Sequence, residues 1–221
     1  MFISHRYKVI FIHIQRTGGN SIHRVFEEYD PDFQYRLPLD PLQKRLKHPF
    51  ASDIKAVTDA GIFQNYIKFC VVRNPFDRMV SWYSMFKHKN TEKKNIPNEF
   101  AEVETVGDAV EAAVADNLAS LEDFLKLSKE DPDGLLVRFH TPQLAFISDE
   151  RGQVLVDRIL RFENLAEEFK AFSREICFDG QLPHTNTSIR RQDYRGYYSE
   201  EMKQEMLFRF REDFEYFGYD F

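Results

Sequence analysis

Residues Lys8–Phe26, KVIFIHIQRTGGNSIHRVF, join an apolar run, a short polar loop and the start of an amphipathic segment. The apolar run is typical of a buried strand, and the apolar spacing beyond the loop predicts a helix that opens near Asn20 or Ser21. The loop itself carries Arg16, Thr17, Gly18 and Gly19. Backbone N–H groups, a positive helix end, hydroxyls and one cation would then converge on one point. We expect a phosphate or a similar tetrahedral anion there.

A second basic strand-to-helix junction spans Lys68–Tyr83, KFCVVRNPFDRMVSWY. Asn74 as N-cap and Pro75 as first helical residue form a favourable helix start. Arg73 ends the apolar strand and is placed to make charge-assisted hydrogen bonds to a phosphate, while Ser81 lies on the following helix. Because ligands of parallel α/β sheets bind at the carboxyl ends of the strands, the two junctions predict a ligand with two anionic groups.

Simpler interpretations of both junctions stay open. The glycines of the first loop could serve only the turn. Arg73 could pair with Asp77 at the surface, and Arg78 could form an ordinary salt bridge.

The composition limits the function classes. The chain has 221 residues, long enough for one domain with a real core. The formal charge of −6 argues against a general nucleic-acid binder, so an anion site has to be local. The two cysteines form neither a disulfide framework nor a metal-ligand spacing. Apolar runs too short to cross a bilayer, and a start without a leader pattern, predict a cytoplasmic protein.

Strand-like and helical segments alternate along the chain. This order predicts an α/β fold of the P-loop type, with three α/β/α layers around a central parallel sheet. We expect a single domain over residues 1–221, with an insertion at 88–134 that is helical in part. The expected elements after the first helix are a helix over 52–61, a strand over 66–73, helices over 75–87, 106–127 and 135–147, a strand over 155–162, a helix over 164–176 and a final helix after Ser199.

The first loop differs from the Walker A motif. That motif requires G-x-x-x-x-G-K-[ST], and the chain has neither the earlier glycine nor the Lys-Ser/Thr pair that would hold Mg²⁺. Hydrolysis of a nucleoside triphosphate is therefore disfavoured.

The two junctions together resemble the sulfotransferase superfamily, and in particular carbohydrate sulfotransferases of the heparan sulfate 2-O- and 6-O- type and their bacterial relatives. HIQRTGGNS is similar to the first cofactor motif of that family, and VVRNPFDRMVSWY to the second. Further similar segments are VDRILRFENL at 156–165, LPHTNTSIRR at 182–191 and DFEYFGYDF at 213–221.

The resemblance implies a donor, 3′-phosphoadenosine 5′-phosphosulfate, and an acceptor hydroxyl on a carbohydrate, with no metal. It assigns the loop residues from Arg16 to Ser21 to the 5′-phosphosulfate. It assigns the 3′-phosphate to Arg73, Ser81, Ser188 and either Arg190 or Arg191. Arg16 stands where the family commonly has Lys, which keeps the charge but changes the geometry.

The acceptor hydroxyl requires a general base, which in this family is His or Glu. His48 lies where the relatives carry a His ahead of a short helix, and it is the favoured candidate. His140 and His184 are alternatives, whereas His13 lies in the strand and is expected to be structural. Two other functions stay open: a P-loop small-molecule kinase, and a nucleotide-binding module without catalysis.

Overall fold

The computed structural model describes residues 1–34, 48–93, 119–130, 139, 141–182 and 193–221. The chain divides into two compact units. Unit 1 comprises Met1–Asn74 and Pro142–Arg190, and unit 2 comprises Pro75–Thr141 and Arg191–Phe221. The single domain expected over residues 1–221 stays a prediction. Among the described helices, none is long and apolar enough to cross a membrane.

Unit 1 contains a four-stranded sheet in the order β1-β2-β3-β4. Strands β2 (Val9–Ile12), β3 (Ile67–Val72) and β4 (Arg158–Arg161) are parallel, as the alternation of strands and helices predicts. At one edge β1 (Phe2–Ser4) pairs antiparallel with β2, so the central sheet is mostly parallel. The short connection between β1 and β2 explains this, because only antiparallel neighbours can be joined by a tight turn.

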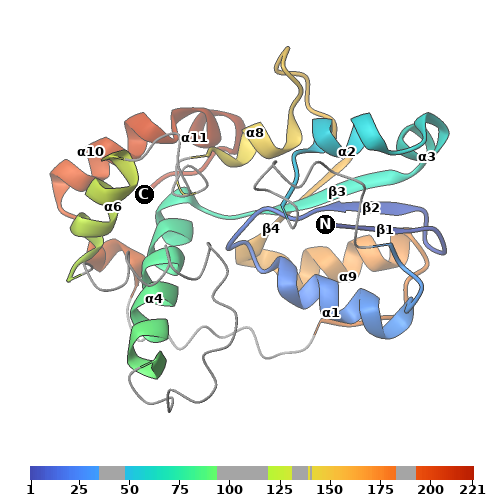
Figure 1. Ribbon diagram of the computed structural model, residues 1–221, viewed down its shortest axis with the longest axis horizontal. Coiled ribbons are helices and arrows are strands. Elements are labelled where there is room, and N and C mark those ends of the chain that lie inside the picture. The colour runs from blue at the N-terminus through green and yellow to red at the C-terminus, as the bar shows by residue number, and fades with distance from the viewer. Residues whose placement is uncertain (35–47, 94–118, 131–138, 140, 183–192) are drawn as a thin grey trace. The chain divides into compact units, whose positions relative to one another are not determined.

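Helices cover both faces of this sheet, which confirms the layered α/β fold. Helices α1 (Gly19–Tyr29) and α9 (Leu165–Glu175) lie on one face, and α2 (Ala51–Val57) and α3 (Ala60–Asn65) lie on the other (Figure 1). Alternate strand residues point to the two faces. The core on the α1 and α9 side includes Phe11, Phe69, Val71, Val25 and Phe169.

The helix predicted over residues 52–61 is two helices, α2 and α3. The Asp59 side chain accepts hydrogen bonds from the backbone N–H groups of Gly61 and Ile62, at 2.8 and 3.2 Å. It therefore acts as an N-cap and begins a new helix. Of the helix predicted over 135–147, Phe139 and residues 141–147 are described, and the helix α8 comprises Gln143–Ile147. Thr141 is not helical because a following proline disfavours the α conformation.

Unit 2 is built from helices. It contains α4 (Pro75–Lys93), α6 (Leu121–Glu130), α10 (Glu200–Arg209), α11 (Arg211–Phe217) and the 3₁₀ turn η3 (Tyr194–Tyr197). Aromatic side chains fill its core; Trp82 and Phe139, for example, have ring centroids 4.5 Å apart. Helix α4 continues past the predicted end near Lys87, and the predicted final helix is interrupted at Phe210.

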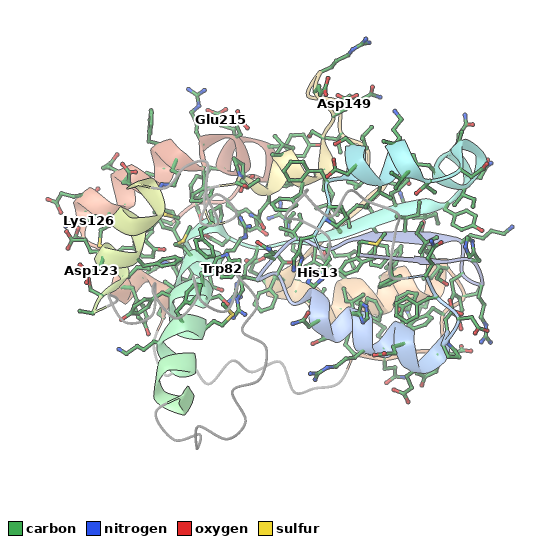
Figure 2. The ribbon with its side chains drawn as sticks, in the orientation of Figure 1. His13, Trp82, Asp123, Lys126, Asp149 and Glu215 are labelled. Atoms are coloured by element: carbon green, nitrogen blue, oxygen red, sulfur yellow. The ribbon has the colours of Figure 1, made fainter. Side chains whose placement is uncertain are left out.

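Only part of the predicted insertion at 88–134 is described. Of the helix expected over 106–127, residues 106–118 lie outside the described residues. Residues 119–120 form bends, and the helix α6 begins at Leu121. Ser120 and Asp123 form reciprocal hydrogen bonds that begin α6, with Ser120 N donating to Asp123 Oδ2 at 2.9 Å. The hydrogen bond from the Ser120 hydroxyl lowers the pKa of the Asp123 carboxyl, which lies on α6 (Figure 2).

Candidate functional site

The loop between β2 and α1 has the backbone conformation of an anion-binding turn. Arg16 and Gly18 both have left-handed backbones, with φ of 66° and 85°. A left-handed residue followed by a right-handed one, as at Gly18 and the helical Gly19, turns successive N–H groups toward one side of the chain. The buried Thr17 closes the loop, because its Oγ1 donates to the Ile14 carbonyl at 2.9 Å. Helix α1 follows from Gly19, one residue before the predicted start.

Gly19 is required by a close approach to His13. A Cβ at Gly19 would lie 2.3 Å from Cδ2 of the His13 ring. His13 itself is buried and stacks on Phe11, with ring centroids 5.4 Å apart (Figure 2). It is therefore a packing residue beneath the helix start, as the sequence predicts. Exposed Asn20 and half-buried Ser21 complete the first turn of α1.

The structure places His48 beside this loop. Its Nδ1 lies 2.9 Å from the His13 carbonyl oxygen, and the two imidazole centroids are 4.5 Å apart. A carbonyl can only accept, so Nδ1 carries the hydrogen. In the neutral ring the proton-accepting lone pair is then on Nε2. This contact therefore fixes the tautomer of the neutral His48 ring.

Arg73 reaches the first loop from the end of β3. Its side chain is buried, and Nη1 donates to the Arg16 carbonyl oxygen at 3.1 Å. The guanidinium carbon lies 3.9 Å from the centroid of the Phe162 ring. Unit 1 thus brings the two predicted basic junctions together at Arg16 and Arg73. Arg73 is only 4 % exposed, which disagrees with its interpretation as a surface residue paired with Asp77.

The side chains of Gln143 and Glu163, which the sequence alone does not identify as site residues, hold the backbone of the second junction. The Gln143 side chain accepts from Arg73 N at 2.9 Å and donates to Arg73 O at 2.8 Å. Glu163 Oε1 accepts from Asn74 N at 2.7 Å. Phe162, which stacks on Arg73, was likewise not selected as a site residue. Phe162 and Glu163 lie in the segment 156–165 that resembles the family, but nothing in the sequence links these three residues to Arg73 and Asn74, which lie far away along the chain.

Of the remaining predicted site residues, some lie in unit 2 and the others lie outside the described residues. Ser81 is buried on α4 in unit 2, and its sharing of a site with Arg73 stays a prediction. Arg78 is also buried in unit 2, where its Nη1 donates to Thr141 O at 3.2 Å. Predictions outside the described residues concern Ser188, Arg190, Arg191, His140 and His184.

In the described part of the chain, His, Cys, Asp and Glu side chains are not grouped as metal ligands, and the Cys70 thiol is buried. Within those ranges, no group of three or more His, Cys, Asp or Glu side chains could hold a metal ion. Burial within β3 raises the pKa of the Cys70 thiol well above its usual value. A thiol in that environment is a packing group.

A family model described as "Sulfotransferase family" matches residues 1–220, almost the whole chain. No curated protein and no solved structure matches the sequence. The chain therefore belongs to the sulfotransferase family, and its α/β architecture with a mostly parallel sheet is compatible with the P-loop type of fold.

Proposed function

We propose that this member of the sulfotransferase family transfers a sulfuryl group from 3′-phosphoadenosine 5′-phosphosulfate to a hydroxyl of a carbohydrate. The observation that carries the proposal is the contact between Arg73 and the Arg16 carbonyl at 3.1 Å. It joins two basic strand ends, as a ligand with two separate anionic groups requires. The proposal also takes residues 1–221 as a single domain in the cytoplasm.

The first loop suits the 5′ end of the donor. When bound, the donor supplies the sulfuryl group and a phosphate as leaving group. The N–H groups of Thr17, Gly18, Gly19 and Asn20 would bind these oxygens. Ser21, whose N–H donates to the Gly18 carbonyl at 3.0 Å, would add its hydroxyl. The Arg16 side chain would add a positive charge where negative charge develops. Left-handed backbones at two loop positions support this role, since they turn N–H groups toward one side.

The second junction suits the 3′-phosphate. Arg73 is an always-charged group with its backbone held by Gln143 and its side chain stacked on Phe162. Such a fixed guanidinium binds a phosphate with little loss of side-chain entropy. Ser81, Ser188 and Arg190 are proposed to complete this subsite.

His48 is the proposed general base. With Nδ1 committed to the His13 carbonyl, Nε2 would take the proton of the acceptor hydroxyl as that oxygen attacks sulfur. The fixed tautomer favours His48 over a surface histidine whose ring can rotate. The proposed base, cation and N–H donors would then all belong to unit 1.

Thermal unfolding with two nucleotides tests the proposal. Adenosine 3′,5′-bisphosphate at 100 times its dissociation constant should add about 2.7 kcal/mol to the free energy of unfolding. ATP with Mg²⁺ should give a much smaller shift at the same concentration. A shift with ATP–Mg²⁺ alone would contradict the proposal and favour a kinase.

Catalysis requires a second readout. Transfer of a labelled sulfuryl group to a panel of oligosaccharides should depend on the donor. Binding of the bisphosphate without transfer to any hydroxyl compound would instead favour a nucleotide-binding module.

A further inference from the structure

The Phe162 ring lies between the two halves of the candidate site. Arg73 stacks on its face, with the guanidinium carbon 3.9 Å from the ring centroid. Gly18 approaches its edge, because a Cβ at Gly18 would lie 3.0 Å from Phe162 Cδ2. Phe162 therefore contacts both the residue proposed to bind the 3′-phosphate and the loop proposed to bind the 5′ end.

The backbone of Phe162 is itself well fixed. It follows Arg161, the last residue of β4, which pairs with Val72 of β3. It begins the 3₁₀ turn η2 (Phe162–Asn164), and the next residue, Glu163, accepts the hydrogen bond from Asn74 N. The ring also packs against the core of unit 1. Sheet pairing and core packing thus set the position of the ring independently of Arg73.

A rigid ring restricts Arg73 in a defined way. Arginine side chains have several rotatable bonds, and an unsupported guanidinium samples many orientations. Stacking on an aromatic face fixes the distance of the guanidinium from the ring, and the Nη1 bond to Arg16 limits its rotation. The same bond links the orientation of Arg73 to the backbone of Arg16, whose φ is 66°.

We infer that Phe162 is a positioning residue for the donor nucleotide. It holds the Arg73 guanidinium in the orientation that distinguishes a nucleotide with a 3′-phosphate from one without it. This inference rests on the proposed function, because it assigns the 3′-phosphate to Arg73. It adds that selectivity for this phosphate depends on an aromatic ring that need not contact the phosphate.

Titration calorimetry with two nucleotides tests the inference. The affinities for adenosine 3′,5′-bisphosphate and adenosine 5′-monophosphate are measured, and their ratio reports selectivity for the 3′-phosphate. Phe162→Leu should lower this ratio by about 3- to 30-fold, the range expected for loss of a cation–π contact. Phe162→Tyr keeps an aromatic face and should retain the ratio.

Phe172→Leu is the matched control. Phe172 is buried on α9 in the same core, with its ring centroid 4.5 Å from that of Phe69. This variant should melt at a lower temperature and keep the ratio of the wild-type protein. If Phe162→Leu fails to fold, Phe162→Met, which also lacks a ring, replaces it under the same criterion.

The outcomes separate the inference from the proposed function. An unchanged ratio in Phe162→Leu, or an equal loss in the leucine and tyrosine variants, would overturn the role of the ring. An equal loss in Phe172→Leu would also overturn it, because general packing would then explain the effect. A wild-type protein that binds the two nucleotides equally would instead contradict the proposed function itself.

Discussion

The two strand-to-helix junctions of unit 1 are organised differently. The first, residues 13–18, takes its shape from its own chain, through the left-handed Arg16 and Gly18 and the bond from Thr17 to Ile14. The second consists of residues 73–74, and side chains from distant segments hold it in place. The first junction is therefore shaped mainly by its own residues, although Arg73 and His48 also contact it, and the second is held mainly by distant segments.

This difference matches the division of work in the proposed function. The locally shaped loop would surround the reacting end of the donor, and His48 is hydrogen-bonded to the carbonyl of His13, the first residue of this loop. The junction held from a distance would anchor the 3′-phosphate. Substitutions at the first should alter turnover or local packing, and substitutions around the second should alter stability and nucleotide affinity.

His48→Asn should give the largest effect. Asparagine retains an N–H that can donate to the His13 carbonyl but cannot accept a proton. Transfer of a labelled sulfuryl group to oligosaccharides should fall by roughly 10²- to 10⁴-fold, the usual contribution of a general base. The affinity for adenosine 3′,5′-bisphosphate, measured by calorimetry, should stay within about twofold. Retained transfer would assign the base to another residue.

Gln143→Leu should destabilise the second junction. It removes both side-chain hydrogen bonds to the Arg73 backbone, which is buried. Two buried polar groups without partners should lower the free energy of unfolding by about 2–4 kcal/mol in denaturant titrations. Gln153→Leu, at an exposed position in the hairpin after α8, is the control and should change it by under about 0.5 kcal/mol. Equal effects of the two variants would contradict the role of Gln143.

Gly19→Ala should destabilise the first junction although alanine is the better helix former. A Cβ at 2.3 Å from the His13 ring has to displace a buried side chain, at about 1–3 kcal/mol in chemical unfolding. In a His13→Ala background only Phe11 Cζ, at 3.0 Å, still lies close to the added Cβ, so the same change should cost much less. If the changes in the free energy of unfolding caused by the two substitutions were additive, the close approach of Gly19 to His13 would not explain why glycine stands at this position.

Glu163→Gln should give the smallest change. The glutamine side chain can still accept from Asn74 N, but the hydrogen bond is no longer charge-assisted. The free energy of unfolding should fall by about 0.5–1 kcal/mol in urea titrations. Glu150→Gln, an exposed change in the hairpin after α8, serves as the reference. A larger loss in the reference variant would remove support for the contact.

Short sequence patterns were enough to predict several strands and helices. Runs of apolar residues marked β2, β3 and β4, helical spacing marked α1 and α9, and Asn74-Pro75 marked the start of α4. Arg16 and Arg73 were selected because each follows an apolar strand, and parallel pairing brings them together. The first junction could be predicted because its residues are contiguous.

Long-range contacts could not be predicted in the same way. Gln143 lies 70 residues from Arg73, and nothing nearby in the sequence distinguishes it from any polar residue at a helix start. Phe162 is one of 22 phenylalanines, and only the folded structure shows that its ring stacks against the Arg73 guanidinium. The antiparallel edge strand β1 was missed because three residues carry too little periodicity.

Calorimetry on Arg73→Ala tests the central claim, that the two junctions bind two separate anionic groups of one nucleotide. Adenosine 3′,5′-bisphosphate carries the 3′-phosphate, and adenosine 5′-phosphosulfate does not. The substitution should weaken the bisphosphate by about 10- to 150-fold, as expected for a lost hydrogen bond to a charged group, and the phosphosulfate by less than about threefold. Equal losses for the two nucleotides would contradict the claim.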